Sequence, residues 1–293
     1  MSETAALADL RRADEPRFGG KSAGLGELIA AGMRVPPGFA VAATAYGRTL
    51  GEPLRAEISR RYEALGEPPV AVRSSAVGED SAEASFAGQQ ETYLSVSGAD
   101  RVCDAVRGCW ASLHSREARA YRERMGGPEE PAMGVTVQIM VDAAVSGVMF
   151  TCNPVNGDPS TVAVNASWGL GTAVVGGEVT PDEYRVSKVT GEVLHRSISP
   201  KRIEYVGGGR SDVPAERQDV ACLDDEQLGM LLEMARKVER HFGSHQDIEW
   251  ALARDGSLFA LQSRPVTVAR KKAAAPARSA IELVMGKFGA DRR

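Results

Sequence analysis

Four polar residues near the C-terminal end of the chain are spaced so that they could bind a metal ion and a phosphate. They lie in the segment DIEWALARDGSLFALQSRP, residues 247–265. The dipeptide Asp255-Gly256 predicts a hairpin with a two-residue type I′ turn. In that register Glu249 lies opposite Gln262 and Asp247 lies opposite Arg264, so the four side chains share one face.

The predicted hairpin has one apolar and one polar face. Two carboxylates, an amide oxygen and a guanidinium cluster on the polar face. Hard oxygen ligands suit Mg²⁺ bound together with substrate phosphates, and an arginine can hold a phosphoryl group through two hydrogen bonds. A solvated face with surface ion pairs is the structural alternative. The residues assigned to the apolar, core-facing side are Ile248, Trp250, Leu252, Phe259 and Leu261.

A second candidate site is the glycine-rich segment Phe18-Gly19-Gly20-Lys21-Ser22. It is not a Walker P-loop, because that pattern requires a glycine five positions before Gly20, where the chain has Glu15. Backbone amides, a helix N-terminus and the Lys21 cation nevertheless suit a phosphate group. A capped helix with a flexible entry explains the same residues equally well.

Two further segments offer groups for phosphate. Arg73-Ser74-Ser75 follows a predicted strand and supplies a second cation with two hydroxyls. The segment SFAGQQET, residues 85–92, could form a flap in which Gly88 and Thr92 touch phosphate. Ordinary capping of loops by small polar side chains is the alternative for both segments.

The elements that must position these residues do not alternate in a regular βαβ order. Long antiparallel hairpins between helices predict an α+β chain, with mixed helices and sheets. Helical patterns cover residues 20–33, 44–65, 99–125 and 224–242. Strands are predicted from residue 39, at 70–76, 135–141, 145–151 and 161–167, and in hairpins at 184–198 and 247–266.

Composition narrows the class of protein. The chain has 293 residues, and 35 Lys and Arg stand against 39 Asp and Glu, for a formal net charge of −4. That near balance argues against nucleic acid or an acidic membrane as a partner. No apolar run approaches the ~20 residues of a membrane helix, and the N-terminus lacks a signal-peptide pattern. The four cysteines show no metal-binding spacing, so buried thiols in a reducing cytoplasm are expected.

Taken together, several segments resemble the N-terminal ATP-binding domain of the phosphoenolpyruvate synthase and pyruvate phosphate dikinase family, an ATP-grasp fold. They are GGKSAGLGEL, VPPGFAVAATAY, VAVRSSAVGEDSAEASFAGQQETYL, VQIMVDAAVSGVMFT, NASWGLG, VTPDEY and DIEWALARDGSLFALQSRPVT. The resemblance implies two lobes clasping a nucleotide within residues 1–268, a smaller lobe over about 1–134 and a strand-rich lobe over about 135–268. The Ala/Lys/Arg-rich tail 269–293 is expected to be a linker or docking helix.

The resemblance also implies roles for matching positions, with ATP and Mg²⁺ as the bound groups. Lys21 and Arg73 would hold the ATP phosphates, and Arg264 would stabilise charge on the transferring group, which makes these three cations the catalytic set. Gly88 and Thr92 would lie in a loop closing over the phosphates, and Gln138 at the adenine side of the hinge. Glu249 and Gln262 would hold Mg²⁺, supported by Asp247.

In the resembling family, ATP pyrophosphorylates a histidine on a separate swivelling domain and leaves AMP. The same domain occurs in rifampin phosphotransferase and phenylphosphate synthase, so the final acceptor stays open. None of the four histidines has the Gly-rich Thr-x-His context, and a phosphohistidine carrier is therefore expected on another domain or subunit. A non-catalytic nucleotide-binding regulatory module and a kinase acting directly on a small molecule are the alternatives.

Two local departures from the family pattern bear on the nucleotide. The segment between Tyr46 and Val70 is shorter than the family's, which affects the helices expected in the smaller lobe. Thr172 follows the segment WGLG where the family usually has Glu. One contact with the nucleotide is therefore expected to be lost or replaced.

Overall fold

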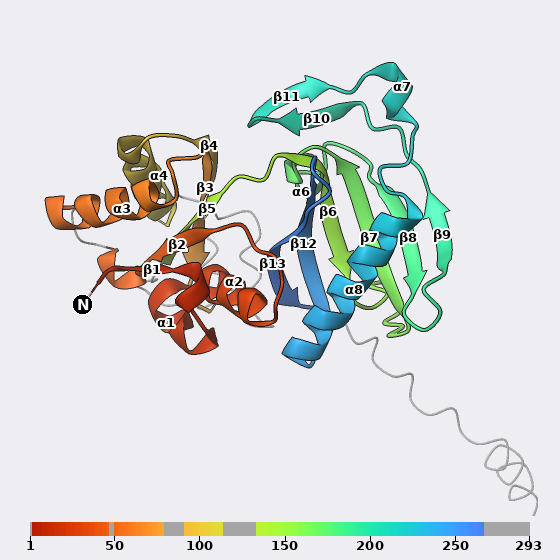
Figure 1. Ribbon diagram of the computed structural model, residues 1–293, viewed down its shortest axis with the longest axis horizontal. Coiled ribbons are helices and arrows are strands. Elements are labelled where there is room, and N and C mark those ends of the chain that lie inside the picture. The colour runs from red at the N-terminus through yellow and green to blue at the C-terminus, as the bar shows by residue number, and fades with distance from the viewer. Residues whose placement is uncertain (1, 47–49, 79–90, 114–132, 267–293) are drawn as a thin grey trace, which may run out of the picture.

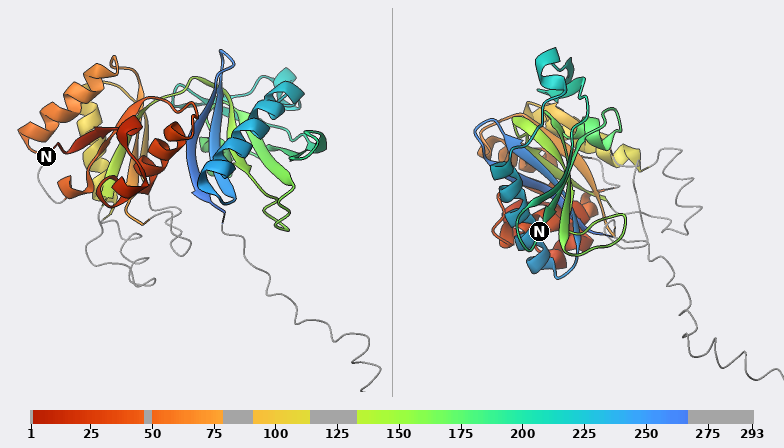
Figure 2. Two further views of the ribbon diagram at one scale, coloured as in Figure 1. Left: turned by 60° about the horizontal axis from the view of Figure 1, so that its bottom comes forward. Right: turned by 90° about the vertical axis from the view of Figure 1, so that its right-hand side faces the viewer.

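A computed structural model of the chain describes residues 2–46, 50–78, 91–113 and 133–266. Two lobes lie side by side, each built around an antiparallel sheet (Figures 1 and 2). The mixed α+β class predicted from the sequence is confirmed. Gly88, His114, the predicted tail 269–293 and the predicted helix beyond Leu113 lie outside the described residues.

The first lobe contains a five-stranded sheet in the spatial order β1-β2-β5-β3-β4, with every neighbouring pair antiparallel. β5 spans the position at which the sequence analysis divides the lobes, and its pairing with β2 and β3 places it in this sheet. The strands are β1 (Thr4–Ala6), β2 (Gly38–Val41), β3 (Val70–Ala76), β4 (Thr92–Val96) and β5 (Met133–Ile139).

Helices cover both faces of this first sheet. On one face, α3 and α4 bury Tyr62 and Trp110 against β3 and β5 in an apolar cluster. On the other face, α2 lies between the sheet and the second lobe, because Leu25 and Leu28 belong to the core of that second lobe. The helices are α1 (Glu15–Phe18), α2 (Gly20–Ala30), α3 (Glu52–Ala64) and α4 (Ala99–Ser112), with short 3₁₀ turns at Leu7–Asp9, Arg12–Asp14 and Ala43–Ala45.

The second lobe contains a six-stranded antiparallel sheet in the order β13-β12-β6-β7-β8-β9. Its amphipathic helix α8 (Asp225–Phe242) begins at Asp224, whose side chain caps the Gln227 amide, and covers one face of the sheet (Figure 1). The strands are β6 (Ala143–Phe150), β7 (Thr161–Trp168), β8 (Asp182–Ser187), β9 (Val193–Ser197), β12 (Gln246–Ala253) and β13 (Leu258–Pro265).

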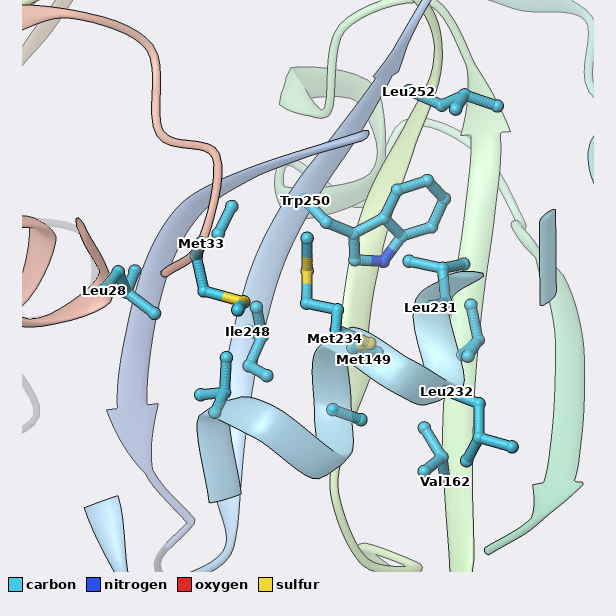
Figure 3. Close-up of a cluster of buried hydrophobic side chains, with 14 of the residues drawn as sticks. Leu28, Met33, Met149, Val162, Leu231, Leu232, Met234, Ile248, Trp250 and Leu252 are labelled. Atoms are coloured by element: carbon cyan, nitrogen blue, oxygen red, sulfur yellow. The ribbon is translucent and has the colours of Figure 1, made fainter. Parts of the chain in front are cut away.

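The core of this lobe lies between α8 and the sheet (Figure 3). Trp250 is fully buried in this core, which also contains Met149 of β6 and Leu231 and Met234 of α8. Burying large apolar side chains of this kind contributes roughly 1.5–3 kcal/mol each. Helix α8 packs on one face of β12. The side chains at the alternate positions of β12 lie on the opposite face, which is turned toward the first lobe.

A small hairpin, β10 (Ile203–Val206) and β11 (Gly209–Asp212), follows β9 and lies above the second sheet together with α7 (Ala215–Gln218) (Figure 1). β10 is fixed to the turn after β7 near the tip of the hairpin, because the Leu170 amide donates to the Tyr205 carbonyl oxygen at 2.9 Å. The turn continues into α6 (Thr172–Val175). At its tip, a Cβ on Gly208 would lie 2.5 Å from Ser95 Oγ, so the hairpin reaches β4 of the other lobe.

The predicted register of the C-terminal hairpin is confirmed at its polar end. Asp247 pairs with Arg264 and Glu249 pairs with Gln262. Toward the turn the prediction is wrong, because a bulge after Glu249 shifts the pairing by one residue. The turn itself contains three residues, 254–256, with Gly256 at φ 81° in the left-handed position.

The bulge also corrects the predicted apolar face. Trp250 pairs with Ala260 and Leu252 with Leu258, so Ala260 and Leu258 face the core instead of Phe259 and Leu261. Leu261 is the extra residue of the bulge, and it lines the cleft between the lobes. The core face is therefore made of smaller side chains than the sequence pattern predicts.

Other predicted elements have different limits. Only the second half of the predicted helix 44–65 is one α-helix, since α3 begins at Glu52. The strands β1, β4, β10 and β11 are absent from the sequence prediction. All four cysteines are buried and free, as expected. Among the described residues, no helix combines the length and the apolar character needed to cross a bilayer.

Candidate functional site

A cleft of about 400 Å³ lies between the two sheets. One wall comes from β3, β4 and the end of β5, and the other from β6, the bulged hairpin β12–β13 and the turn that leads into α6. The residues used below that line it are Arg73, Thr92, Gln138, Ser146, Thr172, Glu249 and Leu261. Residues from both lobes are therefore needed to form this site.

Arg73 joins the two walls of the cleft. Its Nη2 donates to Gln262 Oε1 at 2.8 Å and to Glu249 Oε2 at 3.1 Å, and its Nη1 donates to the Leu261 carbonyl oxygen at 3.3 Å. The bulge at Leu261 turns this carbonyl oxygen out of the strand ladder and so makes it available. The structure thus brings together three residues that the sequence assigns to phosphate and metal, from strands 176 residues or more apart.

Asp247 and Arg264 form a second charged pair on the same hairpin. Both Nε and Nη2 of Arg264 contact Asp247 Oδ2 at 2.8 Å. Burial raises the pKa of Asp247 above its ordinary value, and the neighbouring Arg264 guanidinium opposes that rise. Neither residue lines the cleft itself; Arg264 is 55% exposed, so its outer side faces solvent at the edge of the site.

Lys21 lies in the first turn of α2 and is buried. Cys109, whose thiol is close enough to Lys21 for their charges to interact, contacts the Val72 and Glu91 carbonyl oxygens, which places Lys21 near the β3–β4 pair. Lys21 does not line the cleft described above. It approaches the site from the α2 side of the first sheet.

A buried hydroxyl network fixes the start of α2. The Ser22 amide donates to Ser75 Oγ at 3.2 Å, and Ser22 Oγ lies 2.7 Å from Thr136 Oγ1. No side chain caps α2 from its own N-cap, Gly19, so the hydroxyl of Ser75 on β3 takes that part. Ser75 therefore positions the turn that carries Lys21, a function the sequence analysis did not assign to it.

Gln138 and Thr92 flank Arg73 on the first wall. Thr92 is the cross-strand partner of Arg73. Gln138 is 3% exposed, and its Nε2 donates to the Pro36 carbonyl oxygen at 3.1 Å, which leaves its Oε1 as an acceptor. Ile139 to Val141, which follow directly and line the cleft, connect the two lobes.

The donor set on the second wall fits a hard divalent cation. Glu249 Oε2 and Gln262 Oε1 both contact one nitrogen of Arg73, so their oxygens converge on a single cationic atom. Among the described residues no group of three or more His, Cys, Asp or Glu is arranged for a metal. A Mg²⁺ ion at this place would therefore depend on phosphate oxygens for the rest of its shell, as is usual for that ion.

The described histidines lie away from the cleft. His195 is in β9, His241 Nε2 contacts Glu27 Oε2 at 2.7 Å, and His245 follows α8. His241 joins α8 to α2, since Glu27 belongs to that helix.

One polar residue of the cleft, Ser146, was missed by the sequence analysis. Ser146 is buried and donates to the Gly169 carbonyl oxygen, which holds the turn after β7 in place. Thr172, singled out only as a departure from the family pattern, lines the cleft from the start of α6.

The β10–β11 hairpin was also missed by the sequence analysis. The signal that could have found it is the alternation of Ile203 and Tyr205 before Gly207 to Gly209.

One segment that resembles the family lies outside the site. Asp182 of VTPDEY is fully buried, and its Oδ1 accepts from Lys201 Nζ at 2.6 Å. Its Oδ2 accepts from the Cys222 amide at 2.8 Å and from Tyr184 Oη at 3.2 Å. This network ties β8 to the segments that follow β9 and precede α8, so its part is structural.

The chain matches a family model described as pyruvate phosphate dikinase, AMP/ATP-binding domain, over residues 15–65 and 48–284. A probable phosphoenolpyruvate synthase of Methanothermobacter thermautotrophicus is 39% identical over 310 residues, covering 88% of this chain and 45% of the relative. A rifampicin phosphotransferase of a Streptomyces species is 40% identical over 309 residues, covering 89% and 35%. A solved structure from Pyrococcus horikoshii has 13% identity and a TM-score of 0.45, covering 87% of this chain and 93% of that chain. The chain spans less than half the length of these two curated relatives.

Proposed function

Because the chain belongs to the pyruvate phosphate dikinase AMP/ATP-binding domain family, we propose that it is the nucleotide-binding component of a dikinase-type phosphotransferase. In this proposal it transfers the pyrophosphoryl group of Mg-ATP to a histidine on a separate carrier domain or subunit. The observation that supports it most is the meeting of Arg73 with Glu249 and Gln262 across the wall of the cleft between the lobes. In this proposal the acceptor histidine lies outside this chain, and the described histidines do not line the cleft.

In this proposal each part of ATP has its own end of the cleft. The apolar end, near the connection Ile139 to Val141 and Gln138, takes the adenine, where a buried amide oxygen can accept from the base. The polar end, at Arg73, takes the phosphates, with Thr92 alongside. Lys21 approaches from the α2 side, so two cations of the first lobe, Lys21 and Arg73, face the phosphates.

Glu249 and Gln262 would hold Mg²⁺, with Asp247 supporting them. When it is bound, the ion neutralises part of the negative charge of the phosphates. Asp247 in turn orients Arg264 through the two contacts to Oδ2. The exposed outer side of Arg264 is then directed to where charge develops on the transferring group.

The proposed step is an in-line displacement at the β-phosphorus. The imidazole nitrogen of the carrier histidine supplies its lone pair to form the new N–P bond. The bond from the β-phosphorus to the oxygen bridging to the α-phosphate breaks, and AMP leaves with that electron pair. Arg73 and Lys21 stabilise the transferring oxygens by positioned charge, and they neither gain nor lose a proton in the step.

The test uses the chain, Mg²⁺, ATP labelled at the β-phosphate, and a carrier domain with a Gly-rich Thr-x-His motif from a neighbouring reading frame. We expect acid-labile label on the carrier histidine and one AMP formed for each label. Glu249→Ala and Arg264→Ala should abolish transfer while the circular dichroism spectrum shows that both variants remain folded. Arg254→Ala, at the exposed turn end of the same hairpin, is the matched control with full transfer.

Three outcomes would contradict the proposal. ATP binding without any label on the carrier favours the regulatory module. Wild-type transfer in Glu249→Ala or Arg264→Ala removes these residues from the reaction. Label appearing on a small molecule in the absence of carrier favours the direct kinase.

A further inference from the structure

Arg73 occupies the place that the proposed function gives to a metal ion. Its Nη2 contacts Gln262 Oε1 at 2.8 Å and Glu249 Oε2 at 3.1 Å, which are the two oxygens assigned to Mg²⁺. Both oxygens point to one nitrogen, so the guanidinium is not merely beside the site. It supplies the positive charge that the carboxylate would otherwise lack.

The other contacts of Arg73 hold it on this side of the cleft. Its Nη1 donates to the Leu261 carbonyl oxygen, which belongs to the same bulged strand as Gln262. The side chain is 15% exposed and that of Glu249 is 32% exposed, so the pair is partly shielded but still reached by solvent. The contact therefore uses several of the hydrogen-bond donors of Arg73. Another anion that enters from solvent can still replace Glu249 as the partner of Arg73.

A divalent cation and this guanidinium cannot share the two oxygens. Two like charges a few ångströms apart repel by several kcal/mol at the effective dielectric of a protein surface. The guanidinium must leave before a metal ion can approach, and it needs another anion to compensate for its lost hydrogen bonds. A phosphate oxygen in the cleft is such an anion.

We propose that Arg73 is a built-in cation that blocks the metal site of the nucleotide-free protein and leaves it for phosphate when nucleotide enters. This inference rests on the proposed function, since it takes Glu249 and Gln262 as the metal ligands. The occupant is a hard divalent cation, and it is admitted together with the polyphosphate. The metal needs Arg73 to leave the two oxygens, and the phosphate of the nucleotide binds Arg73 once it has left. By linkage, metal and nucleotide therefore favour each other's binding.

The test is the affinity of the nucleotide-free protein for Mn²⁺, used as the probe and measured by loss of the free-ion signal in electron paramagnetic resonance. Arg73→Met keeps the apolar stem and removes the donors. It should tighten Mn²⁺ binding by roughly fivefold, because a partly exposed ion pair no longer competes for the two oxygens. Arg73→Lys keeps a cation on the same strand and should bind Mn²⁺ as weakly as the wild type.

Two controls separate a specific block from a general effect of charge. Arg254→Met removes one positive charge at the far end of the hairpin, where Arg254 contacts Asp142, and should leave Mn²⁺ affinity unchanged. Glu249→Gln should change little in the wild type, whose site is blocked. The same substitution should cancel the gain in the Arg73→Met background.

The outcomes are distinguishable. The block is overturned if the wild-type protein binds Mn²⁺ as tightly as Arg73→Met does and loses that binding on Glu249→Gln. The assignment of Glu249 as a metal ligand would then still hold. That comparison of wild type with Glu249→Gln needs no Arg73 variant, so the inference can be overturned even if Arg73→Met fails to fold. Absence of Mn²⁺ binding in folded Arg73→Met overturns the metal assignment of the proposed function, and the block with it.

Discussion

Gly19 gives the sharpest test of how the entrance to α2 is built. Its φ is 81°, and a Cβ placed on it would lie 1.9 Å from the Ser75 carbonyl oxygen and 2.4 Å from Ser75 Oγ. The backbone at Ser75 cannot retreat cheaply, because β3 is paired with β5 at this residue. Alanine at position 19 must therefore move the start of α2 and not the strand.

The cost of Gly19→Ala has two parts. A positive φ combined with a ψ of 164° is a backbone conformation that essentially only glycine adopts, and it costs a residue with a Cβ about 1–3 kcal/mol. Steric overlap in a packed region costs roughly a further 1–3 kcal/mol. Gly32 is the matched control, because its φ is 75° and an added Cβ meets no atom within 4 Å. Gly19→Ala should therefore lower the free energy of unfolding by about 1–3 kcal/mol more than Gly32→Ala.

Urea unfolding with linear extrapolation measures this difference, and calorimetric titration with Mg-ATP measures its consequence. Relieving the overlap moves the first turn of α2, and with it Lys21, by about 1 Å, a misplacement that can cost on the order of a hundredfold in a positioned site. ATP affinity should fall in folded Gly19→Ala and stay unchanged in Gly32→Ala. Equal losses of stability in the two variants, or an unchanged ATP affinity in Gly19→Ala, would refute the reasoning.

Three further predictions concern buried polar groups. Lys201→Met leaves Asp182 as an unpaired buried charge and should cost about 3–5 kcal/mol of unfolding free energy in urea. Ser75→Ala removes the acceptor of the Ser22 amide and should cost about 1–3 kcal/mol and weaken ATP binding. Burial raises the pKa of Cys109 to about 12, so this thiol should resist a thiol reagent at pH 8; its stability contribution, complete below its ordinary pKa of 9.0, should be lost as pH rises toward 12.

The polar pairs of the C-terminal hairpin could be predicted because alternation along a strand determines which side chains share a face. The turn could not, since Asp255-Gly256 fits both a two-residue turn and a three-residue loop with Gly256 in the left-handed position. The bulge at Leu261 compensates for the extra turn residue, so the error at the turn end does not reach Glu249 and Gln262. One local cause thus explains both the correct half and the wrong half of the register.

The contacts across the cleft could not be predicted from the sequence, for a different reason. Arg73 and Glu249 each lie in a segment with a recognisable pattern, but no local spacing relates residues 176 positions apart. The resemblance assigns one to phosphate and the other to metal, and it does not say that they touch. That contact depends on how the two sheets face each other, which tertiary packing alone determines.

The strength of the Arg73 contact follows from comparison with the buried ion pair of Lys201 and Asp182. Lys201 and Asp182 are both 0% exposed, so separating them leaves a buried charge without compensation, and that pair can only be permanent. Arg73 and Glu249 keep 15% and 32% exposure, and pairs with such access to water contribute on the order of 1 kcal/mol or less. A polyphosphate offers Arg73 charge-assisted hydrogen bonds stronger than this, so the exchange is downhill once nucleotide is in the cleft. The same reasoning requires that high salt, which screens the exposed pair and spares the buried one, weakens the block on Mn²⁺ without unfolding the lobe.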